Sequence, residues 1–402
     1  MFEKPTPAVR RRIVARNAWQ RRQSSRWCST LLHRIEHVYL HIPFCHRICP
    51  YCSFHKHGIA GHDQSAFVDA VLAEANAAAM IHEIAPKTIY LGGGTPSLLS
   101  AELLGRLLDG MRDAFDTSST LEWSMEANPR TFDGAKAKAF AGMGISRVSL
   151  GIQSWHPDVL KTLGRDHSPD EATQAFDCLR EAGIPSLNID LMFSIPGQTQ
   201  EIWEDTLART IALNPDHVSA YNLTYEEDTE FLERLRSGDF SEDEEIDADH
   251  FTTAIERLKS AGYEHYEISN YGKSEHQSLH NQAYWACRDY LGLGPGAVST
   301  IGGLRTNNLR DTAAYVKGWS AGQDPGNQGT ERLGETERSI ERIALGLRRA
   351  QGLALDILPP EALIELVDAQ YLELTEDDRA RLTASGKLVA DGVIGHLVDA
   401  LS

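Results

Sequence analysis

Short apolar runs of strand character alternate along the chain with longer segments of helical periodicity. The runs are rich in β-branched, leucine and aromatic residues, and polar or glycine-rich positions follow several of them. Segments of roughly 10–20 residues between the runs repeat apolar positions at helical spacing. The predicted strands are residues 38–42, 88–94, 121–129, 147–154, 186–197 and 217–227. This alternation is typical of an α/β protein.

The segment 168–183 shows how clearly one of the predicted helices is delimited. Ser168 can cap its N-terminus together with Glu171, Pro169 suits the first turn, and Gly183 suits the stop. The apolar residues of the segment recur at helical spacing: Ala172, Ala175, Phe176 and Leu179. The next helix shows a similar stripe: Trp203, Leu207 and Ile211.

Six or more strand–helix repeats predict a parallel sheet covered by helices, because parallel strands need crossover connections. In a closed or partial β/α barrel, the carboxyl ends of the strands form the rim where chemistry collects. We therefore expect a parallel, partial β/α barrel with its site on that rim. The predicted parts are a disordered basic arm (1–36), the barrel core (37–320), a linker (321–337) and a small, mainly helical C-terminal domain (338–402).

The charge of the chain limits its partners. With a formal charge of −18, the surface as a whole repels nucleic acid and anionic lipid, so we expect no nucleic-acid binding. No apolar run reaches the ~18 residues of a membrane span. Residues 1–35 hold eight arginines against one acid, Glu3, without an apolar signal core. This arm resembles a transit peptide in composition, but a disordered arm is favoured; we expect a cytoplasmic protein and leave organellar targeting open.

Three of the six cysteines lie close together, with C-x3-C-x2-C spacing, at Cys45, Cys49 and Cys52. Such spacing in a chain otherwise poor in cysteine indicates a metal site in a reducing compartment. Zinc would need a fourth ligand, for which the nearby candidates are His46, His55 and His57. The alternative is an iron–sulfur cluster held by three thiolates, which leaves one iron open to a small molecule.

The amino and carboxylate groups of S-adenosylmethionine (SAM) suit such an open iron. A reduced cluster can then pass an electron to the sulfonium and break a carbon–sulfur bond. The glycine run 92–96 would let backbone amides approach the ligand closely. Glu126 could accept hydrogen bonds from the ribose or the ammonium. Polar residues follow at successive strand tips, namely Gln153, Arg165 and Asp190.

The motifs together resemble the radical SAM superfamily, and within it the coproporphyrinogen dehydrogenase (HemN-like) group. "YLHIPFC", "GGGTPS", "SMEANP", "SLGIQSW", "NIDLMFSIPGQT", "HNQAYW" and "DYLGLGPGA" occur in family order over residues 37–402. The resemblance implies a [4Fe-4S] cluster on the three cysteines. It also implies a set of SAM contacts: Tyr39, Tyr51, Gly93, Gly94, Thr95, Glu126, Gln153, Arg165, Asp190 and Thr224.

Two features distinguish the branches of this group. Coproporphyrinogen dehydrogenases extend the cysteine motif by a further cysteine, and Phe54 stands at that place here. The run "HNQAYW" resembles the H-N-x-x-Y-W motif of HemW heme chaperones. By that resemblance the heme contacts would be His280, Asn281, Tyr284 and Trp285. Other residues could ligate heme iron instead, namely Cys287, His265 and His276.

The resemblance therefore implies a heme chaperone that binds a [4Fe-4S] cluster, SAM and heme and passes heme to an acceptor protein. An electron donor for the cluster and a homodimer are further expected partners. The alternatives are an oxygen-independent coproporphyrinogen III oxidase and a radical SAM heme-degrading methyltransferase. The missing fourth cysteine makes oxidase activity the less favoured of these predictions.

Overall fold

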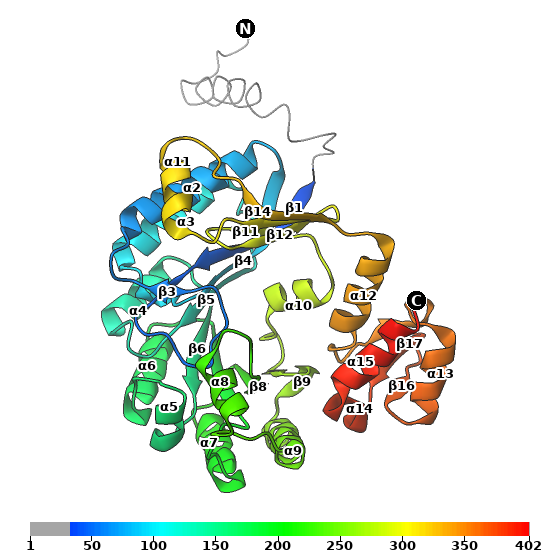
Figure 1. Ribbon diagram of the computed structural model, residues 1–402. Coiled ribbons are helices and arrows are strands. Elements are labelled where there is room, and N and C mark those ends of the chain that lie inside the picture. Colours follow the sequence, from blue (N-terminus) through cyan, green and yellow to red (C-terminus); the bar gives the residue numbers. More distant parts are fainter. Residues whose placement is uncertain (1–32, 402) are drawn as a thin grey trace.

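A computed structural model describes residues 33–401 of the chain (Figure 1). Within them, nine strands form one sheet, in the order β11-β1-β4-β5-β6-β7-β8-β10-β9. The strands of this sheet, in chain order, are β1 (Arg34–Ile42), β4 (Glu83–Gly93), β5 (Glu122–Ala127), β6 (Arg147–Gln153), β7 (Ser186–Phe193), β8 (His217–Asn222), β9 (Glu264–Glu267), β10 (Asn270–Gly272) and β11 (Leu291–Leu293). Each of the six predicted strands is present. The arginine-rich arm lies outside the described residues except for its last four positions.

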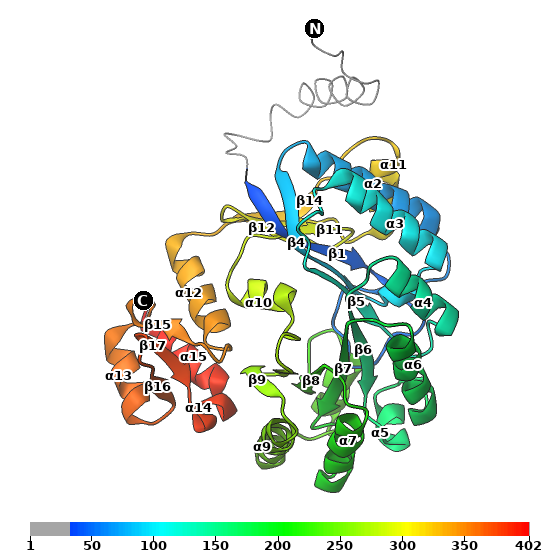
Figure 2. The ribbon, with the colours of Figure 1, turned by 180° about the vertical axis from the view of Figure 1, so that it is seen from behind.

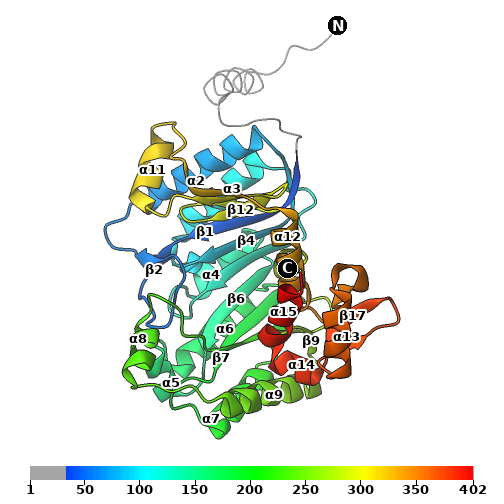
Figure 3. The ribbon, with the colours of Figure 1, turned by 45° about the vertical axis from the view of Figure 1, so that its right-hand side comes forward.

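The sheet is parallel from β11 to β8 and ends in an antiparallel pair, β10 and β9. The two end strands of the sheet, β11 and β9, do not pair with each other. The sheet therefore curves without closing into a barrel. This is the predicted partial barrel. Figure 3 shows the curved sheet from the side, with helices along its outer face.

The crossover helices cover the outer face of the sheet (Figures 1 and 2). They are α2 (Gln64–Ala79), α3 (Ala101–Ala114), α4 (Gly134–Gly142), α5 (Pro157–Thr162), α6 (Pro169–Glu181), α7 (Gln200–Ala212) and α9 (Glu244–Ser260). The short α8 (Glu230–Ser237) lies at the rim instead, where the N–H of Phe231 donates to the carbonyl of Pro50 at 3.2 Å. The predicted capping box of α6 is confirmed, since Ser168 and Glu171 bond each other's backbone N–H groups. The predicted stripe of α7 is also confirmed: Trp203 and Leu207 are buried and Ile211 packs against the core.

Alternation along the strands gives the sheet two different faces. On β6, Val148, Leu150 and Ile152 are at most 1 % exposed and belong to the core under the helices. The residues between them, such as Ser149, face the concave side, where a pocket lies. Because successive side chains of a strand point to opposite faces, the same strands build both the apolar core and a polar interior.

The helix α10 (Leu279–Trp285) stands on the open side of the barrel, between β4 and β9 in Figure 1. It packs against β4, β5 and the C-terminal helix α12. Ser278 caps its first turn by accepting from the N–H of Asn281. The motif "HNQAYW" is therefore helical, which puts His280 and Tyr284 on one face.

A small second sheet and a helix follow α10. They comprise β12 (Val298–Ile301), β13 (Leu304–Asn308), α11 (Thr312–Ser320) and β14 (Asn327–Arg332). The predicted linker, residues 321–337, is therefore not irregular throughout. It contains β14, which pairs with β13. Its strand was hard to predict, since an exposed edge strand has no buried face and hence no apolar alternation.

The C-terminal residues have a hydrophobic core of their own, to which α12, α13 and α15 contribute Ile343, Leu366 and Leu397. Their elements are α12 (Glu335–Gly346), β15 (Leu353–Ala354), α13 (Pro360–Asp368), β16 (Leu372–Leu374), β17 (Arg379–Leu382), α14 (Ala384–Leu388) and α15 (Ala390–Asp399). The unit is mainly helical, as expected, and adds a three-stranded sheet that the helical pattern did not indicate. In the described residues, no helix is long and apolar enough to cross a membrane.

Candidate functional site

The three closely spaced cysteines lie on one loop, residues 43–58, which we call the cysteine loop. It leaves β1 at the rim of the barrel and is closed by the short parallel pair β2 (Phe44–Cys45) and β3 (His57–Gly58). Within it, Cys52 donates its N–H to the carbonyl of Cys49 at 3.1 Å. The Lys56 ammonium donates to the carbonyl of Cys52. These contacts hold the loop in a fixed, compact turn.

Two cysteine sulfurs accept hydrogen bonds from the barrel rim. The hydroxyl of Thr95 donates to Cys45 Sγ at 3.7 Å, and the Arg165 guanidinium donates to Cys49 Sγ at 3.8 Å. Burial raises the pKa of the Cys45 thiol to about 11, so this thiol needs a cation before it ionises at neutral pH. A metal centre would supply that charge, and the two donors would stabilise the thiolates that hold it.

A single zinc ion does not fit this loop. No three His, Cys, Asp or Glu side chains in the described part of the chain gather closely enough to hold one ion. Two of the three histidines that could complete a tetrahedron are engaged elsewhere, since His46 pairs with Asp166 and His57 bonds Thr312. His55 stacks on His41, and its Nε2 has no hydrogen-bond partner in the described structure. Thiols spread over a pocket wall suit a larger, polynuclear cluster instead.

All three cysteines line a pocket of about 410 Å³ inside the barrel, which we call the inner pocket. Most of the other residues predicted for the site also line it: Tyr51, Gly93, Gly94, Thr95, Glu126, Gln153, Arg165, Asp190, Thr224 and Asn281. They come from the cysteine loop, the carboxyl halves of β4 to β7, and segments that follow β6, β8 and β10. The parallel topology thus brings together residues separated by more than two hundred positions.

Glu126 is a half-buried acid that lines this pocket. Its oxygens accept from the hydroxyl of Tyr90 at 2.9 Å and from the N–H of Gly93 at 3.1 Å. Burial, with the nearby charge of Asp190, raises the pKa of Glu126 to about 7 despite these hydrogen bonds. A ligand that donates to this carboxylate would favour its ionised form.

Arg165 and Gln153 also line the inner pocket. Arg165 donates to the carbonyl of Gly151 and to Cys49, so its charge lies beside the cysteine loop. Gln153 has a φ of 70°, and its buried Oε1 accepts no hydrogen bond within the described structure. A left-handed backbone in a non-glycine residue and a buried free acceptor both mark a position shaped for a ligand.

Tyr39 lies behind the pocket and does not line it. Its hydroxyl bonds His41 Nδ1 at 2.9 Å, and His41 Nε2 bonds the carbonyl of His55 at 2.8 Å. Since a carbonyl only accepts, Nε2 carries the proton and Tyr39 donates to Nδ1. Gly93, with a φ of 110°, leaves the room that the His41 ring occupies. Tyr39 therefore acts on the cysteine loop through His41.

Of the motif on α10, Asn281 alone reaches the inner pocket. His280 is 1 % exposed, bonds Thr88 through Nδ1 at 2.8 Å, and packs between the rings of Tyr90 and Tyr284. Burial lowers the pKa of His280 to about 3, so the imidazole is neutral. Its Nε2 has no hydrogen-bond partner in the described chain. Trp285 is half-buried beside Tyr266.

The three rival heme ligands lie away from this pocket. Cys287 is exposed, His265 is stacked on Tyr271, and His276 bonds Ser186.

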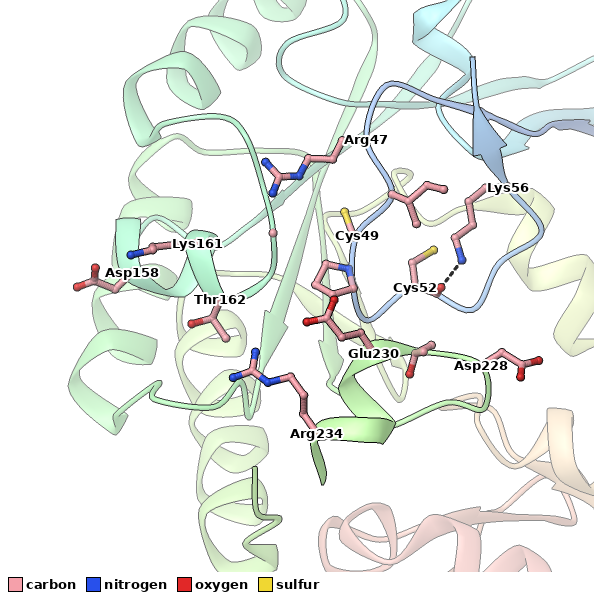
Figure 4. A pocket seen from close by; sticks show the side chains of 14 residues that line it. Arg47, Cys49, Cys52, Lys56, Asp158, Lys161, Thr162, Asp228, Glu230 and Arg234 are labelled. Carbon is pink, nitrogen blue, oxygen red and sulfur yellow. Dashed lines mark hydrogen bonds between the residues drawn. The ribbon is translucent and has the colours of Figure 1, made fainter. Parts of the chain in front are cut away.

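The other side of the cysteine loop faces an open cavity of about 730 Å³, the outer hollow. Figure 4 shows Cys49 and Cys52 at its wall, with Arg47 and Lys56 from the same loop. Helices α5 and α8 supply further charged side chains: Asp158, Lys161, Glu230 and Arg234. The cysteine loop therefore lies between the inner pocket and the more open outer hollow, and four of its side chains line both: Arg47, Cys49, Cys52 and Lys56.

Sequence reasoning missed several other polar residues that line the inner pocket. They are Tyr90, Ser124, Arg147, Ser149, Asn188, Ser219, Tyr221, Asn270 and Ser278. A signal for them existed, because polar residues alternate with apolar ones in "RVSLGIQ" and "SLNIDLMF". In a strand with one face under helices, such alternation indicates a polar interior face.

Comparisons with known proteins agree with this geometry. The family model described as "Radical SAM superfamily" matches residues 39–210. The heme chaperone HemW of Bacillus subtilis is 33% identical over 383 residues, covering 90% of this chain and 99% of the relative. HemW of Mycobacterium tuberculosis is 36% identical, covering 90% and 94%, and HemW of Escherichia coli is 35% identical, covering 89% and 96%.

A solved structure supports the fold. Coproporphyrinogen III oxidase (HemN) from Escherichia coli, a radical SAM enzyme, superposes with a TM-score of 0.78 at 23% identity, covering 91% of this chain and 90% of that one. At this identity the likeness concerns the fold alone. The HemW relatives match over nearly their whole length. The chain therefore belongs to the HemW family of the radical SAM superfamily.

Proposed function

We propose that this protein is a heme chaperone that binds a [4Fe-4S] cluster, SAM and heme, and transfers heme to an acceptor protein. The observation that carries the proposal is the match to HemW chaperones over 99% of the length of the Bacillus subtilis relative. The geometry supports it, since cysteines and a polar pocket meet at the rim where a radical SAM protein needs them.

Cys45, Cys49 and Cys52 would hold the cluster, with Thr95 and Arg165 donating to two of the sulfurs. When bound, the cluster would supply one electron at a time to SAM in the inner pocket. Glu126 would accept from SAM, and the free Oε1 of Gln153 offers a second acceptor. Gly93 and Gly94 form the wall beside them.

The α10 motif is the proposed heme contact. Asn281 reaches the inner pocket, and the neutral His280 keeps a free Nε2. A neutral imidazole nitrogen without a partner is the form that ligates iron. Because His280 is 1 % exposed, coordination through it needs a shift of α10 away from Tyr90.

Oxidase activity is not proposed. Phe54, at the place of the further cysteine of coproporphyrinogen dehydrogenases, is 67% exposed and presents an apolar ring to solvent. A further thiolate beside the cluster is therefore lacking at this position.

Partners follow from the two sides of the cysteine loop. We propose that the electron donor approaches through the outer hollow, where Cys49 and Cys52 lie nearest to solvent. The acceptor protein, a homodimer and a cytoplasmic location are expectations carried over from the family resemblance.

Anaerobic reconstitution with iron and sulfide, followed by titration with heme, tests the proposal. The wild type should gain the ~400 nm absorbance of a cluster and bind about one heme. The triple variant Cys45→Ala/Cys49→Ala/Cys52→Ala should lose the cluster, and His280→Ala should change the Soret band. Incubation with SAM, reductant and coproporphyrinogen III should yield no protoporphyrinogen. Product formation, or a wild type that binds no heme, would contradict the proposal.

A further inference from the structure

We infer that the deep end of the inner pocket is a carboxylate site, with Arg147 as its cation, and that it receives a propionate of the bound heme. The inference rests on the proposed heme binding and names the group of the ligand that the barrel interior would recognise. It involves a part of the pocket that none of the predicted SAM contacts occupies.

Arg147 begins β6 and points to the concave face of the sheet. It shares that face with Ser149, while Val148 between them is buried in the core. The whole residue is 5% exposed, yet it lines the inner pocket. Its guanidinium therefore faces an enclosed space instead of bulk solvent.

Within the described residues, the hydrogen-bond partners of the guanidinium are neutral groups. Nη1 donates to the hydroxyl of Ser186 at 3.1 Å and to the carbonyl of His276 at 2.9 Å. No Asp or Glu oxygen of residues 33–401 forms an ion pair with it within 4.0 Å. Buried charges in proteins are normally paired, because removing an ion from water is costly. Arg147 thus lacks the partner that its burial calls for.

Two half-buried cations of this region have anionic or thiol partners. Arg348 pairs with the buried Glu267 at 2.7 Å, and Arg165 donates to Cys49 in the cysteine loop. Glu122, on the neighbouring strand β5, already accepts from the hydroxyl of Ser124 and from the N–H groups of Leu279 and His280. Its acceptor capacity is committed to holding α10 in place.

The walls around Arg147 are polar but uncharged. They consist of Ser124, Ser149, Asn188, Ser219, Asn270, Ser278 and Asn281. The three acids that line the pocket, Glu126, Asp190 and Glu226, belong to later positions, on the side of the cysteine loop, where Asp190 accepts from the hydroxyl of Ser149 at 2.7 Å. Three cations line that side as well, namely Arg47, Lys56 and Arg165. Charges of both signs therefore meet beside the cysteine loop, whereas Arg147 is the one charged side chain among the described residues that line the deep end, which suits an anion.

A carboxylate is the anion that fits best. A guanidinium and a carboxylate match as planar, two-pronged partners, and the pairing is strong where water is excluded. Heme carries its two negative charges on propionate carboxylates. Asn281, from the proposed heme motif on α10, lines the same pocket, and Arg147 binds the carbonyl of His276 just before that helix. The cation and the motif therefore approach one ligand from two elements.

Heme and its dimethyl ester distinguish this site, since the ester keeps iron and macrocycle but has no carboxylates. Soret titrations should show that the wild type binds heme about 10- to 100-fold more tightly than the ester, the gain expected for a charged hydrogen-bonded pair. Arg147→Gln should bind heme as weakly as the ester, with ester affinity unchanged. Arg147→Lys keeps the charge but loses the planar, two-pronged guanidinium. Its heme affinity should therefore lie between those of the wild type and Arg147→Gln. Arg209→Gln, an exposed arginine of α7, is the matched control.

Each outcome has one meaning. The carboxylate site is wrong if the wild type binds heme and its ester with equal affinity. It is also wrong if folded Arg147→Gln keeps full heme affinity. In both cases the chaperone proposal stands. A wild type that binds neither ligand overturns both. SAM binding and thermal unfolding show whether Arg147→Gln is folded; where it is not, the comparison of heme with its ester on the wild type decides alone.

Discussion

Glu126 shows how burial turns an ordinary carboxylate into a residue poised near neutral pH. The side chain lies between Tyr90 and Gly93, both of which donate to it, yet removal from water and the charge of Asp190 outweigh these bonds. The result is a pKa of about 7 in the ligand-free protein. A partly protonated acid can thus report on ligand binding, because a donor group on SAM interacts favourably with only one of its two forms.

SAM affinity should depend on pH through Glu126. If the carboxylate accepts from the ammonium or ribose of SAM, binding requires its ionised form, and the raised pKa makes that form scarce below about pH 7. The association constant should therefore fall toward tenfold per pH unit below pH 7. Calorimetric titration between pH 5.5 and about 8.5 would measure this. Glu126→Gln should bind weakly and without that slope, whereas a pH profile shared by both proteins would exclude Glu126.

Glu74 is a buried acid that does not line the inner pocket and has a structural role. It accepts from Tyr315 Oη, from the N–H of Gly294 at 2.7 Å and from Asn308 at 2.6 Å. One carboxylate thereby joins α2 to α11 and to the loop that contains Gly294. A Cβ on Gly294 would stand 2.4 Å from the carbonyl of His41, so this loop packs directly on β1 beside the site.

Stability should reveal the protonation of Glu74. Burial raises its folded-state pKa from 4.5 to about 7, so between these values the folded protein holds a proton that the unfolded chain has lost. Stability from this group is therefore full below pH 4.5 and decreases as pH rises to 7, by on the order of 3 kcal/mol. Urea unfolding across this pH range measures the free energy of unfolding of the wild type and of Glu74→Gln. The difference between the two values should change by that amount. A pH-independent difference would refute the assignment.

At the scale of elements, the sequence predicted most of the barrel because each strand and helix carries its own signal. Short apolar runs predict the strands, and Ser168, Glu171 and Gly183 predict the ends of α6. The strand β14 could not be predicted, since its residues are exposed and pair only with β13. The position of His280 could not be predicted either, because enclosure by Tyr90 and Thr88 depends on how α10 packs on a strand 190 residues earlier.

The anchoring of α10 is testable at this scale. Glu122 accepts from the N–H groups of Leu279 and His280, at 2.8 and 3.2 Å, and so fixes the start of the helix against β5. Glu122→Gln replaces an acceptor by an amide donor and should cost about 1–3 kcal/mol of unfolding free energy. Hydrogen exchange should accelerate in residues 279–285 more than in α6. Unchanged exchange in α10 would show that other contacts hold the helix.

The whole molecule carries a formal charge of −18, and individual charged side chains line its barrel interior. One of the links between the C-terminal unit and the barrel is a buried acid, Glu267, which is 1 % exposed. Arg348, following α12, pairs with it at 2.7 Å, and the N–H of Ile268 donates to the carbonyl of the same arginine. Asn270, which lines the inner pocket, also donates to Glu267. A chain of polar contacts thus runs from the C-terminal unit to the pocket.

Removing Arg348 should therefore disturb more than the C-terminal unit. Arg348→Ala leaves the Glu267 charge buried and unpaired and should cost about 3–5 kcal/mol of unfolding free energy. The double variant Glu267→Gln/Arg348→Ala should recover part of this loss, because no isolated charge remains. Chemical unfolding of the four proteins of this cycle gives the coupling energy, and heme titration of the same proteins tests transmission to the pocket.

Because Asn270 lies between Glu267 and the pocket wall, Arg348→Ala should weaken heme binding more than Arg381→Ala, which breaks an exposed pair with Glu373. Equal heme affinity in those two variants would mean that the contact chain ends at Glu267.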